Sequence, residues 1–429
     1  MQLDLAWISL AALLVVIVIS CTTSVNPGLL ALIFAWSIGV YLGPMLGKAF
    51  TVKEVIGGFP ADLFLTLVGV TLLFTMAQGN GTLERIAGSA VRLCRGNVAV
   101  VPFMFFLLAL VLSTIGAGNI AAAALVAPMA MAAAGRMGIP ATLMALMVGH
   151  GAIAGALSPF SPTGIVSNGL MAKMGLSGHE WQSYFHNLVP NLAVAGVAYL
   201  LFGGRTLLRA AAKPAPAELA AEPAAAAPKK LEKAHWATLA VIGLLILGAV
   251  RFEVHVGMAA FAGAVLLAVL KLADEKEAVK AIPWGVIVMV CGVTVLTSLM
   301  EKTGGVDRFS DLIVRFSNET SVTGVIAFVT GILSVYSSTT GVVLPAFLPS
   351  VPGLVEKLGG GDALAIASSI SVGGNMVDVS PLSTIGALCV ASVACAEERR
   401  KVFNQILIWG LSMAVAGALI CYVWFGLLQ

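Results

Sequence analysis

Long apolar segments recur along the whole chain and set the strongest limit on its fold. The first, residues 5–21, holds no charged residue, and similar segments follow it to the C-terminus. A helix needs roughly 20 such residues to cross the apolar core of a bilayer. Since 59% of the 429 residues are hydrophobic and only 10% are charged, a water-soluble globule could not bury this surface. We therefore predict an all-helical, polytopic membrane protein whose first span is retained.

An internal repeat divides the chain into two related halves. The matched positions keep a nearly constant offset and include Pro60 with Pro283, Gly69 with Gly292, Arg85 with Arg308, and the blocks 158–164 with 380–386. Separate blocks rarely keep one offset by chance, so duplication of a structural unit is indicated. We predict a first repeat at residues 1–205, a linker rich in Ala, Pro and Lys at 206–235, and a second repeat at 236–429.

Each repeat is predicted to hold five transmembrane helices and one re-entrant hairpin, about ten spans and two hairpins in all. The hairpins fall near residues 97–135 and 321–356, and broken helices near 140–175 and 361–395. An odd number of spans inverts the second repeat relative to the first. With a cytoplasmic linker, Lys and Arg are about twice as frequent inside as outside, which favours two periplasmic termini.

Four polar clusters interrupt the apolar segments, two in each repeat. They are residues 113–119 and 334–340 in the hairpins, and residues 158–164 and 380–386 in the broken helices. Inside a bilayer, irregular backbone is tolerated where it lines a cavity or is buried in protein. Proline also ends a helix and frees backbone groups. The four clusters are therefore predicted to meet at the binding site near the membrane midplane.

This arrangement resembles the divalent anion/sodium symporter family, in which a hairpin and a broken helix from each inverted repeat meet at the midplane. The hairpin tips of that family would fall on residues 118–120 and 338–340. The N-terminal half, with its Cys21–Gly28 segment and the loop after Ser161, is most similar to MatC-type dicarboxylate carriers associated with malonate uptake. The resemblance implies sodium-coupled import of a small dicarboxylate across a bacterial inner membrane, with a homodimer framed by residues 83–93 and 306–316.

The resemblance also assigns roles to individual residues. Substrate contacts would come from Asn119, Ser161, Pro162, Thr163, Thr339, Thr340, Ser383 and Thr384. Sodium sites would be formed by Ser113, Gly118 and Asn119 with the backbone near Phe160, and by Ser334, Ser337, Ser338 and Thr339 with the backbone near Leu382. Asn375 and Asp378 are further candidates for a cation or a proton, because acids at membrane depth mark functional sites.

The charge pattern fits an anion that is moved together with cations. None of the four clusters contains Lys or Arg, so neutral donors and helix N-termini would hold the anion. Moving a dianion inward costs about 4.6 kcal/mol per 100 mV of inside-negative potential. Sodium ions, the expected coupling ions, would offset this cost. No organic cofactor is expected, and the net charge of +3 gives no support for a nucleic-acid partner.

Other readings remain open on the sequence alone. The substrate could be a C4-dicarboxylate such as succinate or malate. The chain could also be a sodium/proton antiporter or an oxyanion exporter, with Asp378 as the proton carrier. An intramembrane enzyme lacks a supporting motif, and a channel fits two repeat-related broken-helix sites less well. Asp378 could instead only stabilise the helix break, and a structural hydrogen bond is favoured for His150.

Overall fold

The computed structural model describes residues 4–23, 25–86, 98–211, 232–252 and 254–428. Within these ranges the regular structure is helical throughout and contains no strand. Eight helical segments are long and apolar enough to cross a membrane: 27–45, 61–79, 119–137, 233–252, 284–303, 339–358, 363–391 and 396–427. The prediction of an all-helical, polytopic membrane protein is confirmed.

The first half contains helices that range from single short turns to the 22 residues of α11. Its helices are α1 (Leu5–Thr22), α2 (Pro27–Trp36) with α3 (Gly43–Met45), α4 (Val52–Ile56), α5 (Ala61–Gly79), α7 (Val101–Leu112), α8 (Asn119–Met137), α9 (Ala141–Ala154), α10 (Pro162–Lys173), α11 (Glu180–Leu201) and α12 (Gly204–Ala211). The π-helical turns Ser37–Leu42 and Ser113–Ala117 follow α2 and α7. The expected linker lies mostly outside the described residues, as does most of the arm expected at 83–93.

The second half repeats the order of the first. Its helices are α13 (Lys233–Phe252), α14 (Val256–Val269), α15 (Glu275–Ala281), α16 (Trp284–Thr303), α17 (Gly305–Val314), α18 (Val322–Tyr336), α19 (Leu344–Phe347), α20 (Val351–Leu358), α21 (Ala363–Met376), α22 (Thr384–Ala391) and α23 (Ala396–Cys421). A π-helical turn (Thr339–Val343) precedes α19, and 3₁₀ turns (Leu348–Ser350 and Val377–Val379) precede α20 and follow α21. A π-helical turn, Tyr422–Leu427, closes the chain.

Glycines bring the two halves into backbone contact at two equivalent crossings. Where α2 crosses α16, a Cβ added to Gly292 would lie 2.1 Å from the Gly28 carbonyl oxygen. Where α5 crosses α14, a Cβ added to Gly69 would lie 2.4 Å from the Gly257 carbonyl oxygen. Small residues let membrane helices approach this closely. Since Gly69 and Gly292 are repeat partners, the same packing joins the halves twice.

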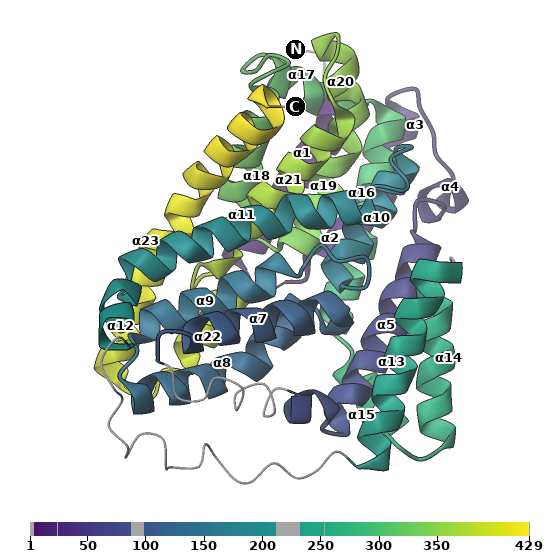
Figure 1. Cartoon of the computed structure of the whole chain (residues 1–429). Coiled ribbons are helices and arrows are strands. Elements are labelled where there is room, and N and C mark those ends of the chain that lie inside the picture. The colour runs from purple at the N-terminus through teal and green to yellow at the C-terminus, as the bar shows by residue number, and fades with distance from the viewer. Residues whose placement is uncertain (1–3, 24, 87–97, 212–231, 253, 429) are drawn as a thin grey trace.

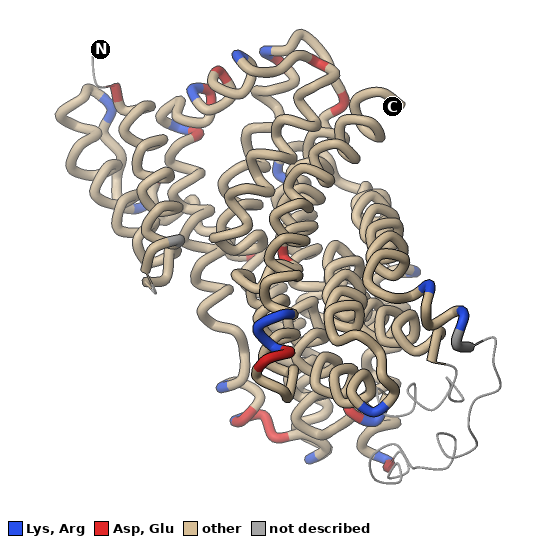
Figure 2. The backbone as a smooth tube through the Cα atoms, turned by 90° about the vertical axis from the view of Figure 1, so that its left-hand side faces the viewer, with Lys and Arg blue, Asp and Glu red and all other residues tan. Residues whose placement is uncertain are grey.

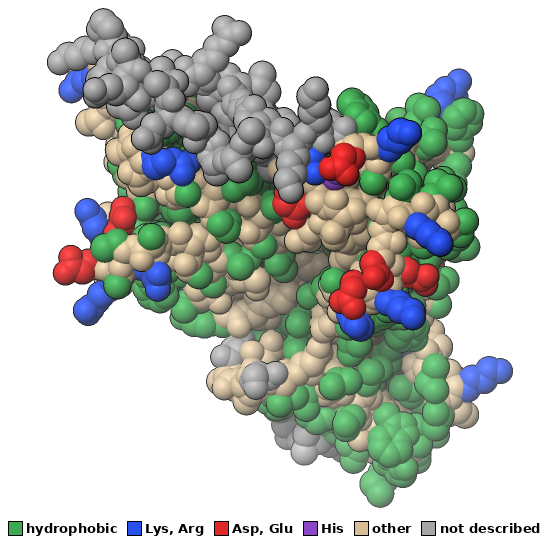
Figure 3. Space-filling view, turned by 90° about the horizontal axis from the view of Figure 1, so that it is seen from below, with side chains coloured by type: hydrophobic (Ala, Val, Ile, Leu, Met, Phe, Trp, Pro, Cys, Tyr) green, Lys and Arg blue, Asp and Glu red, His purple; other side chains and the backbone are tan. Residues whose placement is uncertain are grey.

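The ends of the two halves lie at opposite ends of the molecule. In Figure 1 both termini lie at the upper end of the molecule, whereas the end of α12 and the start of α13 lie at the lower end. Charged residues gather mostly toward these two ends, with a largely uncharged body between them (Figure 2). Seen from below, hydrophobic side chains fill much of the surface between scattered charges (Figure 3).

Candidate functional site

The first hairpin turns at two glycines with positive φ. The π-helical turn after α7 contains Gly116 (φ 122°), and Gly118 (φ 83°) immediately precedes α8. L-residues with side chains rarely adopt such angles, so glycine is required for this reversal. A Cβ on Gly116 would also lie 2.3 Å from Cε2 of Phe74. The turn presents Asn119 as the first residue of α8, with a side chain that is almost fully buried.

The second hairpin turns without glycine at the equivalent positions and uses hydroxyls instead. α18 ends at Ser337, whose backbone is extended. The Oγ of Ser338 accepts a hydrogen bond of 3.0 Å from the amide of Gly341 and so caps the following turn. Thr339 and Thr340 begin that turn, and Thr339 is buried. The sequence difference between the two tips therefore corresponds to two different ways of making the same reversal.

The two broken helices share one local geometry. In the first half, the Phe160 amide donates to Ser158 Oγ at 3.3 Å and the Ser161 amide donates to the Ser158 carbonyl at 3.0 Å. In the second half, the amides of Leu382 and Ser383 make the same bonds to Ser380, also at 3.3 and 3.0 Å. These bonds satisfy backbone groups that the break would otherwise leave unpaired. The helix resumes at Pro162 and at Thr384.

The first broken helix and the second hairpin meet at a cavity. The Oγ1 atoms of Thr163 and Thr340 are 2.8 Å apart and form a hydrogen bond between the halves. A cavity of about 320 Å³ lies beside them and is also lined by Gly118, Asn119, Pro162 and Ser338. Among the described residues, its lining contains no charged side chain. We call it the neutral cavity. Its described residues offer an anion neutral donors.

A second cavity of about 230 Å³ lies next to the neutral cavity and contains an acid. Its lining includes Ser337, Ser338, Thr339, Thr340, Asp378, Leu382, Ser383 and Thr384, and it shares Asn119, Ile120, Ser338 and Thr340 with the neutral cavity. We call it the acidic cavity. The Oγ1 of Thr339 lies 3.0 Å from both carboxylate oxygens of Asp378, and Ser334 Oγ lies 3.4 Å from one of them. Ser383 Oγ donates to the Asp378 carbonyl at 2.6 Å.

Buried polar atoms without a hydrogen-bond partner gather in the predicted clusters and near Asp378. Across the described residues they are Ser113 Oγ, Ser161 Oγ, Ser337 Oγ, Asn375 Nδ2 and Asn375 Oδ1. Leaving such an atom unpaired costs about 1–3 kcal/mol. Proteins rarely retain that cost without a reason, and binding of an ion or a water molecule is one of the reasons. The oxygen atoms in this set are suited to a hard cation such as sodium.

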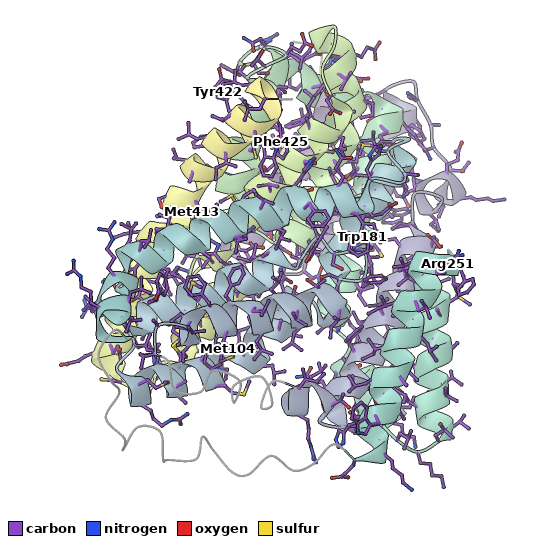
Figure 4. The ribbon with its side chains drawn as sticks, viewed as in Figure 1. Met104, Trp181, Arg251, Met413, Tyr422 and Phe425 are labelled. Carbon is purple, nitrogen blue, oxygen red and sulfur yellow. The ribbon has the colours of Figure 1, made fainter. Side chains whose placement is uncertain are left out.

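The structure brings together most of the predicted site residues but not all of them. Asn119, Pro162, Thr163, Thr340, Ser383, Thr384, Ser337, Ser338, Thr339, Leu382, Asp378 and Gly118 line one or both cavities. Ser334 contacts that lining through Thr339 and Asp378. Ser113, Ser161, Phe160 and Asn375 are buried and line neither cavity. The ring of Phe160 instead packs edge-on against the ring of Trp181, with centroids 6.2 Å apart. Trp181 lies at the start of α11 (Figure 4).

A buried chain of hydrogen bonds from α23 to the first break escaped the sequence analysis. Trp409 donates to His150 Nε2 at 2.9 Å, and His150 Nδ1 lies 3.0 Å from Asn191 Oδ1. The side-chain Nδ2 of Asn191 donates to the backbone carbonyl of Asn187 at 2.9 Å. Asn187 Nδ2 then donates to the carbonyl of Ile153 at 2.7 Å, at the end of α9. The structural hydrogen bond expected for His150 is confirmed. The other hydrogen bonds of this chain involve Asn187 and Asn191, and their helical spacing in α11 was the sequence signal that could have indicated them.

One face of α5 also escaped the sequence analysis. Thr71, Phe74, Thr75 and Gln78 all line the neutral cavity. Their spacing of three and four residues places them on one face of a helix. The signal was present in the sequence, but it lay outside the four polar clusters.

An apolar chain, helical throughout its described residues, in which each half brings a turn between two helices and a broken helix to adjoining cavities has the features of a membrane transporter rather than of an enzyme. Residues 1–156 match the family described as Dicarboxylate carrier protein MatC N-terminus, and residues 253–429 match the family described as Citrate transporter. The predicted resemblance to dicarboxylate carriers is thereby confirmed, and the chain is of transporter type. A sequence comparison with curated proteins gave no match.

Two solved transporters share the fold. The YdaH transporter of Alcanivorax borkumensis superposes with a TM-score of 0.61 at 17% identity, covering 96% of this chain and 98% of that one. MtrF of Neisseria gonorrhoeae, described as illuminating a class of antimetabolite efflux pumps, superposes with a TM-score of 0.55 at 12% identity, covering 97% and 96%. At these identities the likeness extends to the fold alone.

Proposed function

We propose that this protein imports a small dicarboxylate, with malonate as the favoured substrate, by sodium symport through alternating access. The hydrogen bond between Thr163 and Thr340 is the observation that carries the proposal, because it joins a broken helix of one half to a hairpin tip of the other. Asn119, at the tip of the first hairpin, lines the same cavity. The similarity to dicarboxylate and citrate carriers supports a small organic acid as the substrate.

The two cavities suit different solutes. The described lining of the neutral cavity has hydroxyl and amide groups and no acid, so a dianion could occupy it without charge repulsion from these residues. The acidic cavity contains the Asp378 carboxylate, which would repel a dianion but attract a cation. We assign the substrate to the neutral cavity and a coupling cation to the acidic one. Because Asn119 and Thr340 line both cavities, the bound dianion and the coupling cation would lie close together.

The residues around the acidic cavity fit sodium. Sodium prefers oxygen ligands, and this region offers the Asp378 carboxylate and the hydroxyls of Thr339 and Ser334. Ser337 Oγ and Asn375 Oδ1 have no partner in the described structure and could complete a ligand set. In the first half, the repeat partner of Ser334 is Ser113, whose Oγ is unpaired. Ser113 remains our candidate for a second sodium site, together with Gly118, Asn119 and the backbone of Phe160.

The two halves would act as inverted repeats, at residues 1–205 and 236–429. The repeat-related glycine crossings and the common geometry of the two breaks support this. Both termini lie at one end of the molecule and the ends flanking the linker at the other, which suits a cytoplasmic linker and periplasmic termini in a bacterial inner membrane (Figure 1). A homodimer in the bilayer would complete the arrangement.

Uptake by reconstituted protein tests this proposal. Proteoliposomes are given labelled malonate under an inward sodium gradient, with potassium as the control cation. We expect sodium-dependent accumulation that unlabelled malonate and, more weakly, longer diacids suppress. Uptake that is the same in sodium and potassium would refute sodium symport. Absence of both uptake and binding of every C3 to C6 diacid would refute the dicarboxylate assignment, while preference for succinate or malate would make the protein a C4-dicarboxylate symporter.

A second candidate function follows from the buried carboxylate in the acidic cavity. If Asp378 carries a proton, the protein would exchange protons for sodium or drive export of an oxyanion. Asp378→Asn separates the two candidates, since it keeps an oxygen ligand but cannot carry a proton. The symporter predicts that this variant still takes up malonate, with weaker sodium dependence, whereas an antiporter predicts complete loss. Asp62→Asn is the matched control, because Asp62 is exposed and pairs with His255 at 2.7 Å, away from both cavities.

A further inference from the structure

The neutral cavity has a wall that belongs to neither a hairpin nor a broken helix. This wall is one face of α5 and presents Thr71, Phe74, Thr75 and Gln78 to the cavity. α5 packs along α14, at the glycine crossing between Gly69 and Gly257. The face is therefore held in place by contacts with the other half of the chain.

Of the polar groups on this wall, only Gln78 keeps donors for a bound anion. Thr71 Oγ1 donates to the Leu67 carbonyl at 2.6 Å, and Thr75 Oγ1 donates to the Leu72 carbonyl at 2.9 Å. A hydroxyl has one proton to donate, so both are committed to their own helix. The Gln78 side chain has no hydrogen-bond partner among the described residues, and its amide carries two N–H groups.

A second amide is available in the hairpin wall of the same cavity. Asn119 Oδ1 accepts a hydrogen bond of 3.0 Å from the Ile120 amide, and this contact leaves Nδ2 as the group free to donate. Asn119 and Gln78 thus contribute free amide donors from two different elements, the first hairpin tip and α5. A ligand with a carboxylate at each end could engage one amide with each. A ligand with a single carboxylate could engage only one of them.

Gln78 also stands where the neutral cavity opens. Together with Thr75 and Ala281 it lines both this cavity and a wide vestibule of about 1130 Å³ between the ends of α5, α14 and α15. The vestibule carries charges of both signs, among them Lys271, Asp274 and Glu275. A carboxylate at Gln78 would therefore be the one that faces the opening, and Asn119 would hold the inner one.

The repeat would not have indicated this role. Glu301 in α16 occupies the position that matches Gln78, given the register that pairs Gly69 with Gly292. A carboxylate at the matching place would repel an anion instead of donating to it. The neutral amide is thus specific to α5, which distinguishes the two halves.

We propose that Gln78 holds the outer carboxylate of the substrate and thereby sets the preference for diacids over monoacids and for diacid length. This inference rests on the proposed function, since it takes a dicarboxylate as the substrate. The inner carboxylate is bound by Asn119, Thr163 and Thr340, and the separation between these residues and Gln78 selects the chain length. Loss of the Gln78 amide removes the second anchor and leaves the first intact.

Binding measurements on the purified full-length protein test the role of Gln78. Straight-chain diacids of three to six carbons and the monoacid propionate are titrated in sodium, for the native protein, Gln78→Leu and Gln78→Asn. Gln182→Leu is the matched control, because Gln182 is exposed on α11 and lines neither cavity. We expect Gln78→Leu to weaken diacid binding about tenfold, as for a lost hydrogen bond to a charged group, and to leave propionate binding unchanged. Gln78→Asn, with its shorter side chain, should shift the preference to a longer diacid.

The outcomes separate this inference from the proposed function. If the native protein binds diacids and both Gln78 variants bind them with native affinity and length preference, Gln78 has no such role and the function stands. Equal weakening of diacid and propionate binding would also overturn the role. If the native protein binds no diacid, the proposed function and this inference fail together. Should Gln78→Leu not fold, the length preference of Gln78→Asn still decides.

Discussion

The Oγ1 atoms of Thr163 and Thr340 lie 2.8 Å apart, although Thr163 lies in the first turn of α10 in the first half and Thr340 lies in the turn after α18 in the second. A hydroxyl pair shares one proton in this bond, which leaves the second proton free for a ligand. A bound carboxylate could accept from both hydroxyls, but only if the bond between them opens. Substrate binding would then exchange a contact between the halves for contacts with the substrate.

This exchange makes the two threonines one functional unit. We expect Thr163→Val and Thr340→Val each to weaken substrate binding about tenfold, and the double variant to bind little worse than either, since each single change already breaks the shared geometry. The free energy of unfolding should fall by only about 1 kcal/mol, the net value of one hydrogen bond. Isothermal titration with the preferred diacid measures the binding free energy of the native protein, the two single variants and the double variant. Thr22→Val is the control, because Thr22 is exposed and donates only to its own helix. Additive losses in the double variant would contradict the coupling.

At the two glycine crossings, replacing a glycine by a larger residue should destabilise the protein, because an added Cβ would lie too close to the backbone of the other helix. Gly292→Ala places a methyl group 2.1 Å from the Gly28 carbonyl oxygen, and backbone cannot rotate away as a side chain can. We expect the free energy of unfolding to fall by about 1–3 kcal/mol, the range for overpacked cores. Gly69→Ala at the related crossing should behave alike. Gly243→Ala is the matched control, since a Cβ there meets nothing within 4 Å, and it should be neutral or stabilising by about 0.4–1 kcal/mol. Denaturant titration in detergent provides the measurement.

The positions of the helix breaks could be predicted from the sequence because local chemistry sets them. Proline and adjoining hydroxyls occupy the break in each half, and the broken helices predicted at 140–175 and 361–395 correspond to α9 with α10 and α21 with α22. The described part of the segment predicted as the first hairpin, residues 98–135, contains α7 and most of α8, with a turn between them. Short-range signals of this kind need no knowledge of packing.

The parts of the site that depend on packing could not be predicted in this way. Asn187 satisfies the end of α9 from a helix far along the chain, and nothing next to either position indicates that they meet. Gln78 lines the cavity because α5 packs against the other half. The repeat paired Gly69 with Gly292, but their contact partners Gly257 and Gly28 appear only in the folded molecule.

The unpaired hydroxyl of Ser337 allows a test of the sodium site that does not depend on transport. In potassium, Ser337→Ala removes a buried group that has no partner, so the free energy of unfolding should rise by about 1–3 kcal/mol. In sodium the gain should shrink, because the native protein is then stabilised by the ion that Ser337 helps to bind. Thermal unfolding across a sodium series measures both effects. Ser369→Ala is the control, since Ser369 Oγ already donates to the Ala365 carbonyl at 2.7 Å, and it should lower stability equally in both salts. An equal gain in both salts for Ser337→Ala would exclude Ser337 as a ligand.

The hydrogen-bond chain that ends on α9 should control the shape of the first break. Asn187 Nδ2 donates to the carbonyls of Ile153 and Ala154 at 2.7 and 3.3 Å. Both carbonyls lie in the last turn of α9, where the usual i+4 amide donors end, and the Ile153 carbonyl also accepts from the Ala156 amide at 2.9 Å. Asn187→Leu has nearly the same volume but leaves the Ala154 carbonyl buried and unpaired and the Ile153 carbonyl with only backbone donors such as the Ala156 amide, so we expect a loss of about 1–3 kcal/mol in the free energy of unfolding. Trp409→Phe acts at the far end of the chain, where it removes only the donor to His150. Trp409→Phe should lower the free energy of unfolding less, and it should leave substrate affinity unchanged because the hydrogen bonds to the α9 carbonyls persist.

Asn187→Leu should also weaken substrate binding, since the break positions Thr163 at the neutral cavity. Native affinity in Asn187→Leu, measured under conditions where the variant is folded, would show that the break holds its shape without this cap.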